Sequence, residues 1–294
     1  MKKTRPELIV LIGLPGSGKT TYAKRYVEAM GKCGNVIRLS SDSIRAELYG
    51  DESVQGNPEV VFSTMRQRAL DALSDGVSVV YDATNVTRKD RASIMSVCPK
   101  YVSTEAHIIW APIEDCIMQD ASRKRTVGKA VIDKMLKRFQ APWYDEGFHA
   151  IDLFHESLDM WSYTRKCLDT MDIPHDNPHH EFGVKDHCLT AEKFAKDNGY
   201  NDDIIWAARW HDVAKPYTKE FVDGKGNPSE TAHFYQHHCA GSYMSYGLSG
   251  VSFYRAWLIS THMDPFLNTK YYNNLPALYK NDIDLLHQCD LNAH

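Results

Sequence analysis

Short apolar runs separated by helix-forming stretches fill the first half of the chain. These runs predict buried strands at residues 7–12, 35–40, 77–82 and 107–111. Helical patterns follow at residues 19–30, 41–49 and 131–139. Because strands that alternate with helices form parallel sheets, we expect an α/β domain with helices flanking a parallel sheet over residues 1–152. Residues 153–294 are mostly helical in pattern, which predicts a second, all-α domain.

The two halves also differ in charge. Residues 1–150 contain 22 Lys and Arg against 18 Asp and Glu, whereas residues 151–294 contain 12 against 20. Of the 14 histidines, 12 follow Ala150. A mildly basic half favours a polyanionic ligand, and an acidic half rich in imidazoles favours divalent cations. Random drift of surface charge is the alternative explanation for the charge difference alone.

A glycine-rich segment, Gly13-Leu14-Pro15-Gly16-Ser17-Gly18-Lys19-Thr20, directly follows the first apolar run. This pattern is typical of a P-loop, in which main-chain N–H groups surround a polyphosphate, the lysine reaches its β and γ groups and the threonine ligates Mg²⁺. A chance glycine-rich turn is the alternative, but the strand before the segment and the helix after it favour a P-loop. We expect ATP or GTP with Mg²⁺ here, held by Gly13, Pro15, Gly16, Ser17, Gly18, Lys19, Thr20 and Thr21.

Two acidic residues stand where predicted strands end. Asp42 lies one helical turn before Arg45, and such a pair can accept a proton from a hydroxyl and hold a phosphate. Asp82 ends the third apolar run, where an acid commonly serves the Mg²⁺ of a P-loop site. Each carboxylate can instead be only a helix cap. The position of both residues favours a functional role over a helix cap, because ligands bind beyond the carboxyl ends of parallel strands.

A basic cluster, Arg123-Lys124-Arg125, is expected on the helix after the fourth strand. In a P-loop kinase such a cluster is placed like a lid, where an arginine neutralises charge as the phosphoryl group is transferred. A solvated run of charges is the alternative.

Together these residues resemble the phage-type polynucleotide 5′-kinase family of P-loop phosphotransferases. The resemblance covers about residues 7–150, including Asp82-Ala83-Thr84-Asn85 and residues 142–148. It implies that Asp42 is the general base on a 5′-hydroxyl and that Arg45 binds the 3′-phosphate of the acceptor. It also implies a lid arginine on the donor phosphates, for which Arg125 is favoured and Arg123 is the alternative.

Histidines and carboxylates recur through the second half in helical contexts. His211-Asp212 ends a predicted helix at residues 203–210, and Lys215 follows three residues later. Imidazoles and carboxylates that converge from several helices can hold one or two divalent cations. Any one histidine taken alone is more often a packed or surface residue. The further candidate ligands are His187, His237, His238, His262 and Asp290.

The order and spacing of these residues look like the HD superfamily of metal-dependent phosphohydrolases, over about residues 175–292. The resemblance implies a principal metal held by His187, His211, Asp212 and Asp290. It further implies that Asp212 bridges to a second ion held by His237 and His262, with His238 ranked lower. His180 and Lys215 are candidate phosphate contacts. Such ligands suit Mn²⁺, Ni²⁺, Co²⁺, Fe²⁺ or Zn²⁺.

The leading interpretation is a bifunctional enzyme that heals broken RNA ends, with DNA as a further substrate. An ATP-dependent 5′-hydroxyl polynucleotide kinase would be joined to a metal-dependent 3′-phosphatase or 2′,3′-cyclic phosphodiesterase. The alternative is a small-molecule or nucleoside kinase fused to an HD nucleotidase. A third reading makes the P-loop a nucleotide-gated switch for the second domain, but a switch needs no acceptor base such as Asp42.

Other features bear on surroundings and partners. No apolar run approaches a membrane span, and the N-terminus lacks a signal-peptide pattern, so we expect a cytoplasmic protein with no membrane partner. The seven cysteines contain no C-x-x-C pair, and we expect them to be free thiols. The expected partners are nucleic-acid ends and a separate RNA ligase. A net charge of −4 predicts weak, salt-sensitive binding to nucleic acid. The sequence leaves the oligomeric state, the metal identity and the preference between RNA and DNA open.

Overall fold

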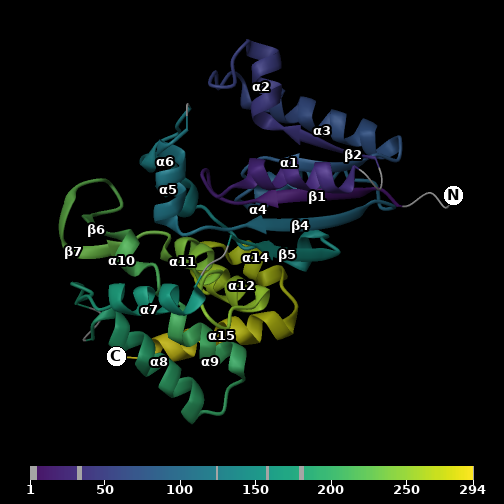
Figure 1. Cartoon of the computed structure of the whole chain (residues 1–294). Coiled ribbons are helices and arrows are strands. Elements are labelled where there is room, and N and C mark those ends of the chain that lie inside the picture. Colours follow the sequence, from purple (N-terminus) through teal and green to yellow (C-terminus); the bar gives the residue numbers. More distant parts are fainter. Residues whose placement is uncertain (1–4, 32–34, 124, 157–158, 179–181, 294) are drawn as a thin grey trace. The chain divides into compact units, whose positions relative to one another are not determined.

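The chain divides into two units in the computed structural model, which describes residues 5–31, 35–123, 125–156, 159–178 and 182–293 (Figure 1). The first unit runs to Met135 and resumes over Pro142–Glu156. The second contains the short segment Leu136–Ala141 and the chain from Ser157 onward. The sequence predicts a single boundary between residues 152 and 153. The structure in addition assigns six residues of the first half, Leu136–Ala141, to the second unit.

A parallel sheet of five strands forms the centre of the first unit, in the order β2-β3-β1-β4-β5. This confirms the predicted parallel sheet with flanking helices. Since all five strands are parallel, their carboxyl ends share one edge. The fourth strand covers residues 103–109 rather than the expected 107–111. The strands are β1 (Glu7–Ile12), β2 (Val36–Ser40), β3 (Ser78–Asp82), β4 (Ser103–Ile109) and β5 (Ala150–Phe154).

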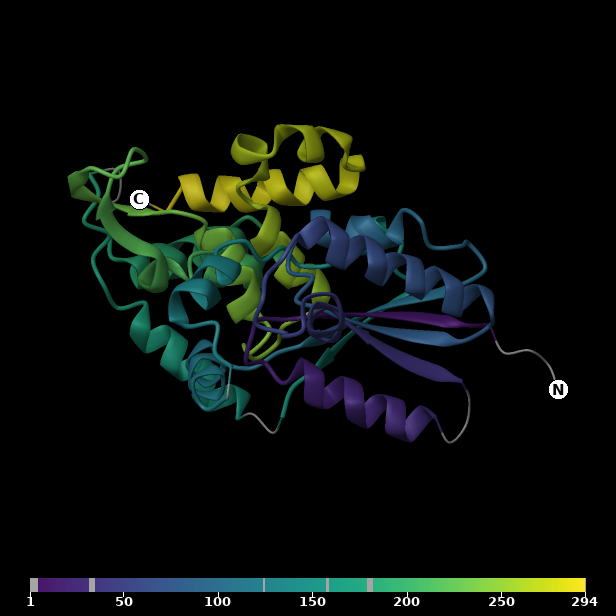
Figure 2. The same ribbon diagram turned by 90° about the horizontal axis from the view of Figure 1, so that it is seen from above.

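Helices cover both faces of this sheet, with α1 and α3 on opposite faces (Figure 2). On one face Ala23 of α1 packs with Ile9, Leu11 and Val80 of the strands. The other helix, α3, buries one side of an amphipathic pattern that begins at Val61. The helices are α1 (Lys19–Met30), α2 (Ser41–Tyr49), α3 (Pro58–Ser74), α4 (Arg88–Met95), α5 (Ile113–Ala121), α6 (Lys129–Leu136) and the 3₁₀ turn η1 (Tyr144–Glu146).

Arg123 and Arg125 of the basic cluster do not lie on a helix, as the sequence had predicted, but on the loop between α5 and α6; Lys124 lies outside the described residues. Helix α5 ends at Ala121 because the carboxylate of Asp120 turns the chain. Its oxygens accept hydrogen bonds from the Val127 and Gly128 amides at 3.0 and 2.9 Å. Arg123 and Arg125 therefore lie on this loop, and α6 begins at Lys129 rather than at residue 131.

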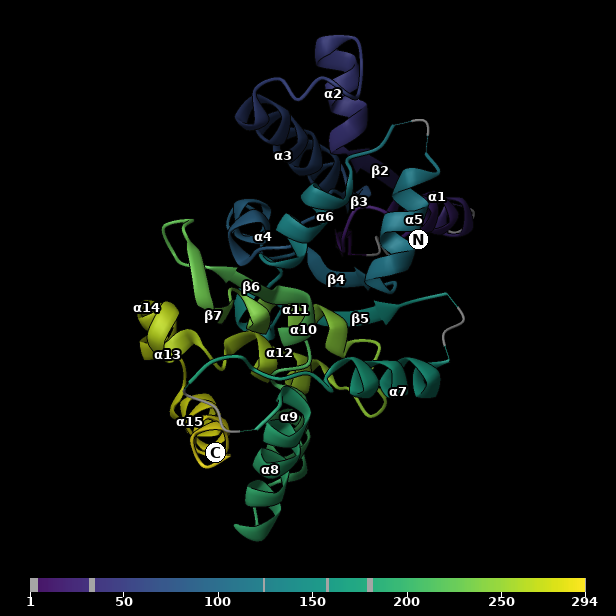
Figure 3. The same cartoon turned by 90° about the vertical axis from the view of Figure 1, so that its left-hand side faces the viewer.

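Helices dominate the second unit, in which α8 and α9 run side by side (Figure 3). Small side chains at Ala191, Ala195, Ala207 and Ala208 are fully buried, which allows the helices to approach closely. The helices are α7 (Met160–Thr170), α8 (Val184–Asp197), α9 (Asp202–Trp210), α10 (Lys215–Thr218), α11 (His237–Ser245), α12 (Phe253–Thr261), α13 (Asp264–Leu267), α14 (Thr269–Asn274) and α15 (Ala277–Leu291).

The unit is not purely helical, so the expectation of an all-α domain is wrong. Strands β6 (Lys219–Val222) and β7 (Pro228–Phe234) form an antiparallel hairpin. Its turn is fixed by Asp223, whose Oδ1 accepts hydrogen bonds from the Lys225 and Asn227 amides, both at 2.8 Å. Gly226 adopts a φ of 87°, which favours glycine.

Leu136–Ala141 packs into the second unit through aromatic contacts. The Phe139 ring meets the rings of Tyr243 and Tyr246 edge-on, at centroid distances of 5.2 and 6.1 Å. The Ala141 amide donates a hydrogen bond to Ser260 Oγ. Burial of a large aromatic side chain explains why this segment leaves the first unit.

None of the helices in the described ranges is long and apolar enough to cross a bilayer. The cysteines at 98, 116, 167, 188, 239 and 289 are free thiols, as expected, and Cys33 lies outside the described residues.

A buried ion pair fixes α4 against η1 in the first unit. Arg91 is fully buried, and its Nε and Nη2 donate to the two carboxylate oxygens of Glu146 at 2.6 and 2.7 Å. Its Nη1 donates to the carbonyl of Asn85 at 3.0 Å.

We predict that Arg91→Met lowers the free energy of unfolding by about 3–5 kcal/mol, because the buried carboxylate of Glu146 then keeps only the more distant Arg88, at 3.9 Å, as a charged partner. Urea unfolding of the first unit measures the loss. Arg68→Met removes the half-exposed pair with Glu47 and should cost only about 0–1 kcal/mol. Equal losses in the two variants would contradict the importance of this pair.

Candidate functional sites

The glycine-rich segment forms a tight loop between β1 and α1. Gly16 and Gly18 have φ angles of 82° and 92°, in the region that side chains rarely adopt. A Cβ atom on Gly16 would lie 2.0 Å from the carbonyl oxygen of Cys116, so the loop passes too close to α5 for any side chain. The Gly13 amide is anchored by a hydrogen bond to the Thr84 carbonyl at 3.1 Å.

Lys19 is buried at the start of α1, where its Nζ donates to the Leu14 carbonyl of the same loop at 2.6 Å. Burial lowers its pKa to about 8, Asp82 opposes this shift and Arg123 adds to it. Ser17 Oγ is also buried and has no hydrogen-bond partner among the described residues. A buried cation and this hydroxyl, at the N-terminus of a helix, fit a polyphosphate. Pro15 is buried in the loop, whereas Thr21 is exposed on α1.

Asp82 and Thr20 come together at the carboxyl edge of the sheet. Thr20 Oγ1 donates to Asp82 Oδ2 at 3.4 Å, as suits two groups that serve one Mg²⁺. The cap of α4 is Thr87, not Asp82. Arg38 Nε and Nη2 lie 2.7 and 2.6 Å from the same oxygen and fix the carboxylate. Sequence reasoning missed Arg38, although a lone charge within an apolar strand was the available signal.

Asp42 is half-exposed and held by two arginines. Its Oδ1 lies 2.9 Å from Arg45 Nη1 and 3.3 Å from Arg125 Nη1. Oδ2 has no hydrogen bond with another described residue. The cap of α2 is Ser40, so Asp42 is not there as a cap. The structure thus brings Arg125 from the α5–α6 loop to Asp42, while Arg123 of the same loop contributes to the electrostatic field at Lys19.

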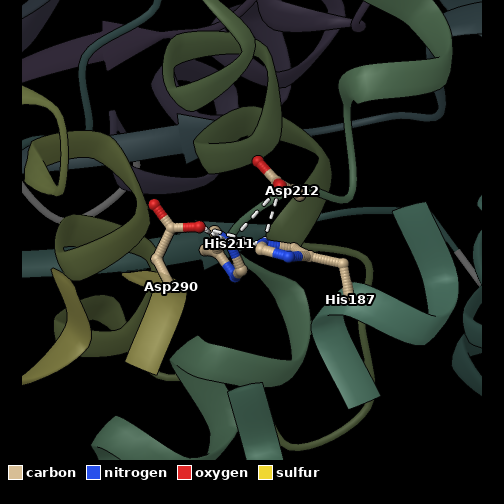
Figure 4. A group of neighbouring side chains, drawn as sticks. All are labelled: His187, His211, Asp212 and Asp290. Carbon is tan, nitrogen blue, oxygen red and sulfur yellow. Dashed lines mark hydrogen bonds and ion pairs between the residues drawn. The ribbon is translucent and has the colours of Figure 1, made fainter. Parts of the chain in front are cut away.

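Four residues from three helical segments converge in the second unit, and we name them the principal group (Figure 4). His187 lies on α8, His211 and Asp212 directly follow α9, and Asp290 lies on α15. Each offers a ligand atom within 4.8 Å of the others. His187 Nε2 is 2.9 Å from Asp290 Oδ1, and His211 Nε2 is 3.3 Å from Asp212 Oδ2.

A second group, composed of Asp212, His237 and His262, shares its carboxylate with the principal group. His237 begins α11 and His262 follows α12. His237 Nε2 lies 3.3 Å from Asp212 Oδ1, on the side of the carboxylate opposite to the one that His211 faces. The structure therefore brings together both sets of residues that the sequence proposed as metal ligands.

Backbone contacts fix the orientation of all four imidazoles. Nδ1 of each ring lies 2.8 to 3.1 Å from a carbonyl oxygen, to which it donates its proton; the rings are His187, His211, His237 and His262. In neutral rings Nε2 then carries only a lone pair. Yet Nε2 of His187 lies 3.3 Å from that of His211, and Nε2 of His237 lies 3.2 Å from that of His262. Two facing lone pairs repel each other, so each pair of Nε2 atoms must share either a proton, as the raised pKa of His211 allows, or a metal ion. Hydrogen bonds from Nδ1 to the backbone are typical of metal-ligating histidines.

Asp212 concentrates the negative charge of both groups. It is 1% exposed, and Lys215 Nζ and His211 Nε2 lie 2.6 and 3.3 Å from Oδ2, while His237 Nε2 lies 3.3 Å from Oδ1. Burial raises the pKa of this carboxyl, but His211 and Lys215 outweigh it and hold the pKa well below its usual range. Burial likewise opposes protonation of His211, but Asp212 raises the pKa of that imidazole well above its usual value. A buried, ionised carboxylate is a strong ligand for divalent cations.

Lys215 and His175 lie beside the principal group. Lys215 Nζ is 2.6 Å from Asp212 Oδ2 and 3.1 Å from His175 Nε2. Burial and the nearby Lys215 lower the pKa of His175 to about 4. Sequence reasoning missed His175, because a single histidine in a loop between Pro174 and Asp176 gives no periodic signal.

Two further histidines, His180 and His238, were candidate site residues in the sequence. His180 lies outside the described residues. His238 is buried, and its ring touches those of His237 and His262 edge-on without joining either group of ligands. Burial, with the neighbouring His237, lowers its pKa to about 3.

Comparison with known proteins bears on the first unit. Residues 8–142 match the family model of the AAA domain. The transcription factor bHLH140 of Arabidopsis thaliana is 26% identical over 165 residues, which are 54% of this chain and 17% of that protein. L-seryl-tRNA(Sec) kinase of Methanococcus maripaludis is 24% identical over 170 residues, which are 56% of this chain and 65% of that protein. The chain therefore spans less than two thirds of either relative.

Solved structures show weaker likeness. A chain of the Pnkp1/Rnl/Hen1 RNA repair complex is 21% identical with a TM-score of 0.41, over 45% of this chain and 43% of that one. The APS kinase CysC of Mycobacterium tuberculosis is 18% identical with a TM-score of 0.40, over 56% and 96%. Scores at this level carry no argument about function. The family model, the parallel sheet and the loop together give the first unit a P-loop kinase-like fold, which implies a nucleotide such as ATP with Mg²⁺ as its ligand.

We predict that ATP affinity falls as the pH rises through about 8, because the polyphosphate requires the protonated form of Lys19. Bound phosphates raise the pKa of Lys19, so affinity is unaffected well below pH 8 and declines above it toward about tenfold per pH unit. Titration of a fluorescent ATP analogue across this range measures the effect. Lys19→Arg, whose guanidinium stays charged, should show weaker but pH-independent binding. A flat profile for the wild type would contradict the prediction.

Substitution of the candidate metal-ligating side chains should lower the number of bound Mn²⁺ ions by one or by two, depending on whether the side chain belongs to one group or to both. His262→Ala is expected to lower the number per chain by one, and Asp212→Ala by two, because only Asp212 belongs to both groups. His233→Ala, in the hairpin, is the matched control and should leave the number unchanged. Equilibrium dialysis with elemental analysis measures it. Equal effects of Asp212→Ala and His262→Ala would argue against a shared carboxylate.

Proposed function

We propose that this protein heals broken RNA ends with two activities, one for each unit. The kinase domain transfers the γ-phosphoryl group of ATP to a 5′-hydroxyl end, and the second unit, as an HD-type phosphohydrolase, removes a 3′-phosphate or opens a 2′,3′-cyclic phosphate. The observation that carries the proposal is Asp42, a carboxylate held between two guanidinium groups at the carboxyl edge of the sheet. A switch that transfers no phosphate has no use for such a group.

Asp42 is suited to act as the general base. Both arginines contact Oδ1, which leaves Oδ2 to accept the proton of the attacking hydroxyl. Arg45 is placed to bind a phosphate of the acceptor, and Arg125 to neutralise charge on the transferred group. An acceptor that carries its own phosphate, such as the 5′-terminal nucleotide of a strand, makes use of this second guanidinium, whereas an uncharged metabolite does not.

The donor side follows from the P-loop. Lys19 would leave the Leu14 carbonyl and bind the β and γ phosphates, while Thr20 and Asp82 hold the Mg²⁺. Arg38 keeps the Asp82 carboxylate in place at the strand end. These residues orient the donor in line with the hydroxyl that Asp42 deprotonates.

In the second unit, His187, His211, Asp212 and Asp290 would hold one divalent cation, and Asp212, His237 and His262 a second. When bound, these ions supply Lewis-acid chemistry for the hydrolysis of a phosphate ester. Lys215, whose Nζ lies beside Asp212 and His175, would bind a phosphate oxygen. The two activities together produce the 5′-phosphate and 3′-hydroxyl ends that a separate RNA ligase joins.

The relatives suggest one further acceptor to test. The Methanococcus maripaludis relative is named as a kinase of L-seryl-tRNA(Sec). A kinase assay of this protein should therefore compare three acceptors: seryl-tRNA, a nucleoside and a 5′-hydroxyl oligoribonucleotide. Preference for the oligoribonucleotide supports the proposal. Equal or better phosphorylation of the nucleoside would favour a small-molecule kinase instead.

We predict that Asp42→Asn reduces 5′ phosphorylation by about 10²–10⁴-fold and leaves hydrolysis of the 3′ end unchanged. Asp212→Asn should abolish hydrolysis and leave phosphorylation unchanged. The substrate is an oligoribonucleotide with a 5′-hydroxyl and a 2′,3′-cyclic phosphate, and both ends are analysed with and without ATP. Asp75→Asn, an exposed residue at the end of α3, is the control. Loss of both activities in either variant would refute this division of labour.

A further inference from the structure

A third group of ligand-type side chains lies in the first unit, on the sheet face covered by α1. Side chains alternate between the two faces of a strand, so Glu105 and His107 of β4 share one face. In the parallel register Asp152 of β5 is aligned with His107, and Leu11 of β1, which packs with α1, is aligned with His107 on the other side. Glu7 of β1 lies on this same face by the same alternation.

The geometry of this group suits a cation. His107 Nε2 lies 3.0 Å from Glu105 Oε2 and 3.9 Å from Asp152 Oδ2. Each of the three residues offers one ligand atom within 4.8 Å of the others. The side chain of His107 is 3% exposed and that of Asp152 is 51% exposed, so a buried imidazole faces a side that is open to solvent.

Tyr22 and its neighbours fix the imidazole. The Tyr22 hydroxyl lies 2.8 Å from His107 Nδ1, and the rings of Tyr22, Tyr26 and Phe154 surround His107 at centroid distances of 4.9 to 5.8 Å. An outer hydrogen bond to Nδ1 is what sets the orientation of a histidine that binds metal through Nε2. The Nε2 atom is then directed at the two carboxylates.

The charges around His107 are unbalanced. Glu7, Glu105 and Asp152 are three carboxylates, and within the described residues none of them forms an ion pair with Lys or Arg. Burial, with the nearby Glu105, raises the pKa of Glu7, and burial with Glu7 and Glu105 raises that of Tyr26 to about 12. Burial is the larger cause of both shifts, and the carboxylates add to it.

We propose that Glu105, His107 and Asp152 form a structural site for a first-row divalent cation such as Zn²⁺, separate from both sites described above. Two carboxylates and one imidazole, completed by water on the exposed side, match the donors that Zn²⁺ and Co²⁺ accept. The ion would bind Nε2 of His107 in the tautomer that carries the proton on Nδ1, where it donates to the Tyr22 oxygen; the proton that Nε2 shares with Glu105 without metal therefore moves to Nδ1. Through Tyr22, the ion ties β4 and β5 to α1, the helix that begins with Lys19 and Thr20.

The test compares Zn²⁺ binding by the full chain and its variants after removal of metal with a chelator. Asp152→Asn, which changes a half-exposed side chain, should lower the number of bound Zn²⁺ by one, as should Glu105→Gln. Asp75→Asn should not. In an Asp212→Ala background, which lacks the cations of the second unit, calorimetry should show this Zn²⁺ site, weakened about tenfold or more by Asp152→Asn. Co²⁺ absorption in the same background should show bands that require His107.

The same experiments can also contradict the proposal. If Asp152→Asn and Glu105→Gln fold normally and bind as many Zn²⁺ ions as the wild type, the site does not exist. Thermal unfolding without metal separates this outcome from a folding defect, since both substitutions should leave the metal-free melting temperature almost unchanged. Addition of Zn²⁺ should then raise the melting temperature of the Asp212→Ala protein but not that of Asp212→Ala combined with Asp152→Asn.

Discussion

Burial of charge is the constraint on which both candidate sites depend. A charged group removed from water is costly unless a partner of opposite charge meets it. Within the part of the chain that the structure describes, the hydrogen-bond acceptor of buried Lys19 is a main-chain carbonyl, which suits an anionic ligand. Asp212 is buried among Lys215 and imidazoles whose Nε2 atoms face its oxygens. A polyphosphate fits the first arrangement, and divalent metal ions are the ligands that we propose for the second.

The folds hold these charges in place through ordinary rules of secondary structure. In the first unit, parallel strands end at one edge, so Asp82 and the P-loop lie together there although 62 residues separate Asp82 from Thr20. In the second unit, His211 and His262 each follow the last residue of a helix and donate a proton to one of its terminal carbonyls. Carbonyls at a helix end lack partners within the helix. These two candidate metal ligands therefore cap the helices that they follow.

Much of the first unit could be predicted because its signals are local. The strand at 7–12, the helix at 19–30 and the loop between them follow from periodicity and glycine spacing. Arg38 and His175 could not be assigned, since each gains its role only from a distant partner.

The loop between α5 and α6 and the β6–β7 hairpin could not be predicted either, because each depends on hydrogen bonds between a side chain and the backbone. A single carboxylate, Asp120 in one case and Asp223 in the other, turns the chain by accepting hydrogen bonds from main-chain amides. Hydrophobic periodicity does not record such contacts. The ligand sets were proposed from order and spacing, and the structure adds that each of the four imidazoles directs Nδ1 at a main-chain carbonyl. The most direct test is a crystal structure with Mn²⁺, measured at an anomalous wavelength. The account predicts two peaks that flank Asp212, one near His187, His211 and Asp290 and the other near His237 and His262. Absence of both peaks at saturating Mn²⁺ would contradict it.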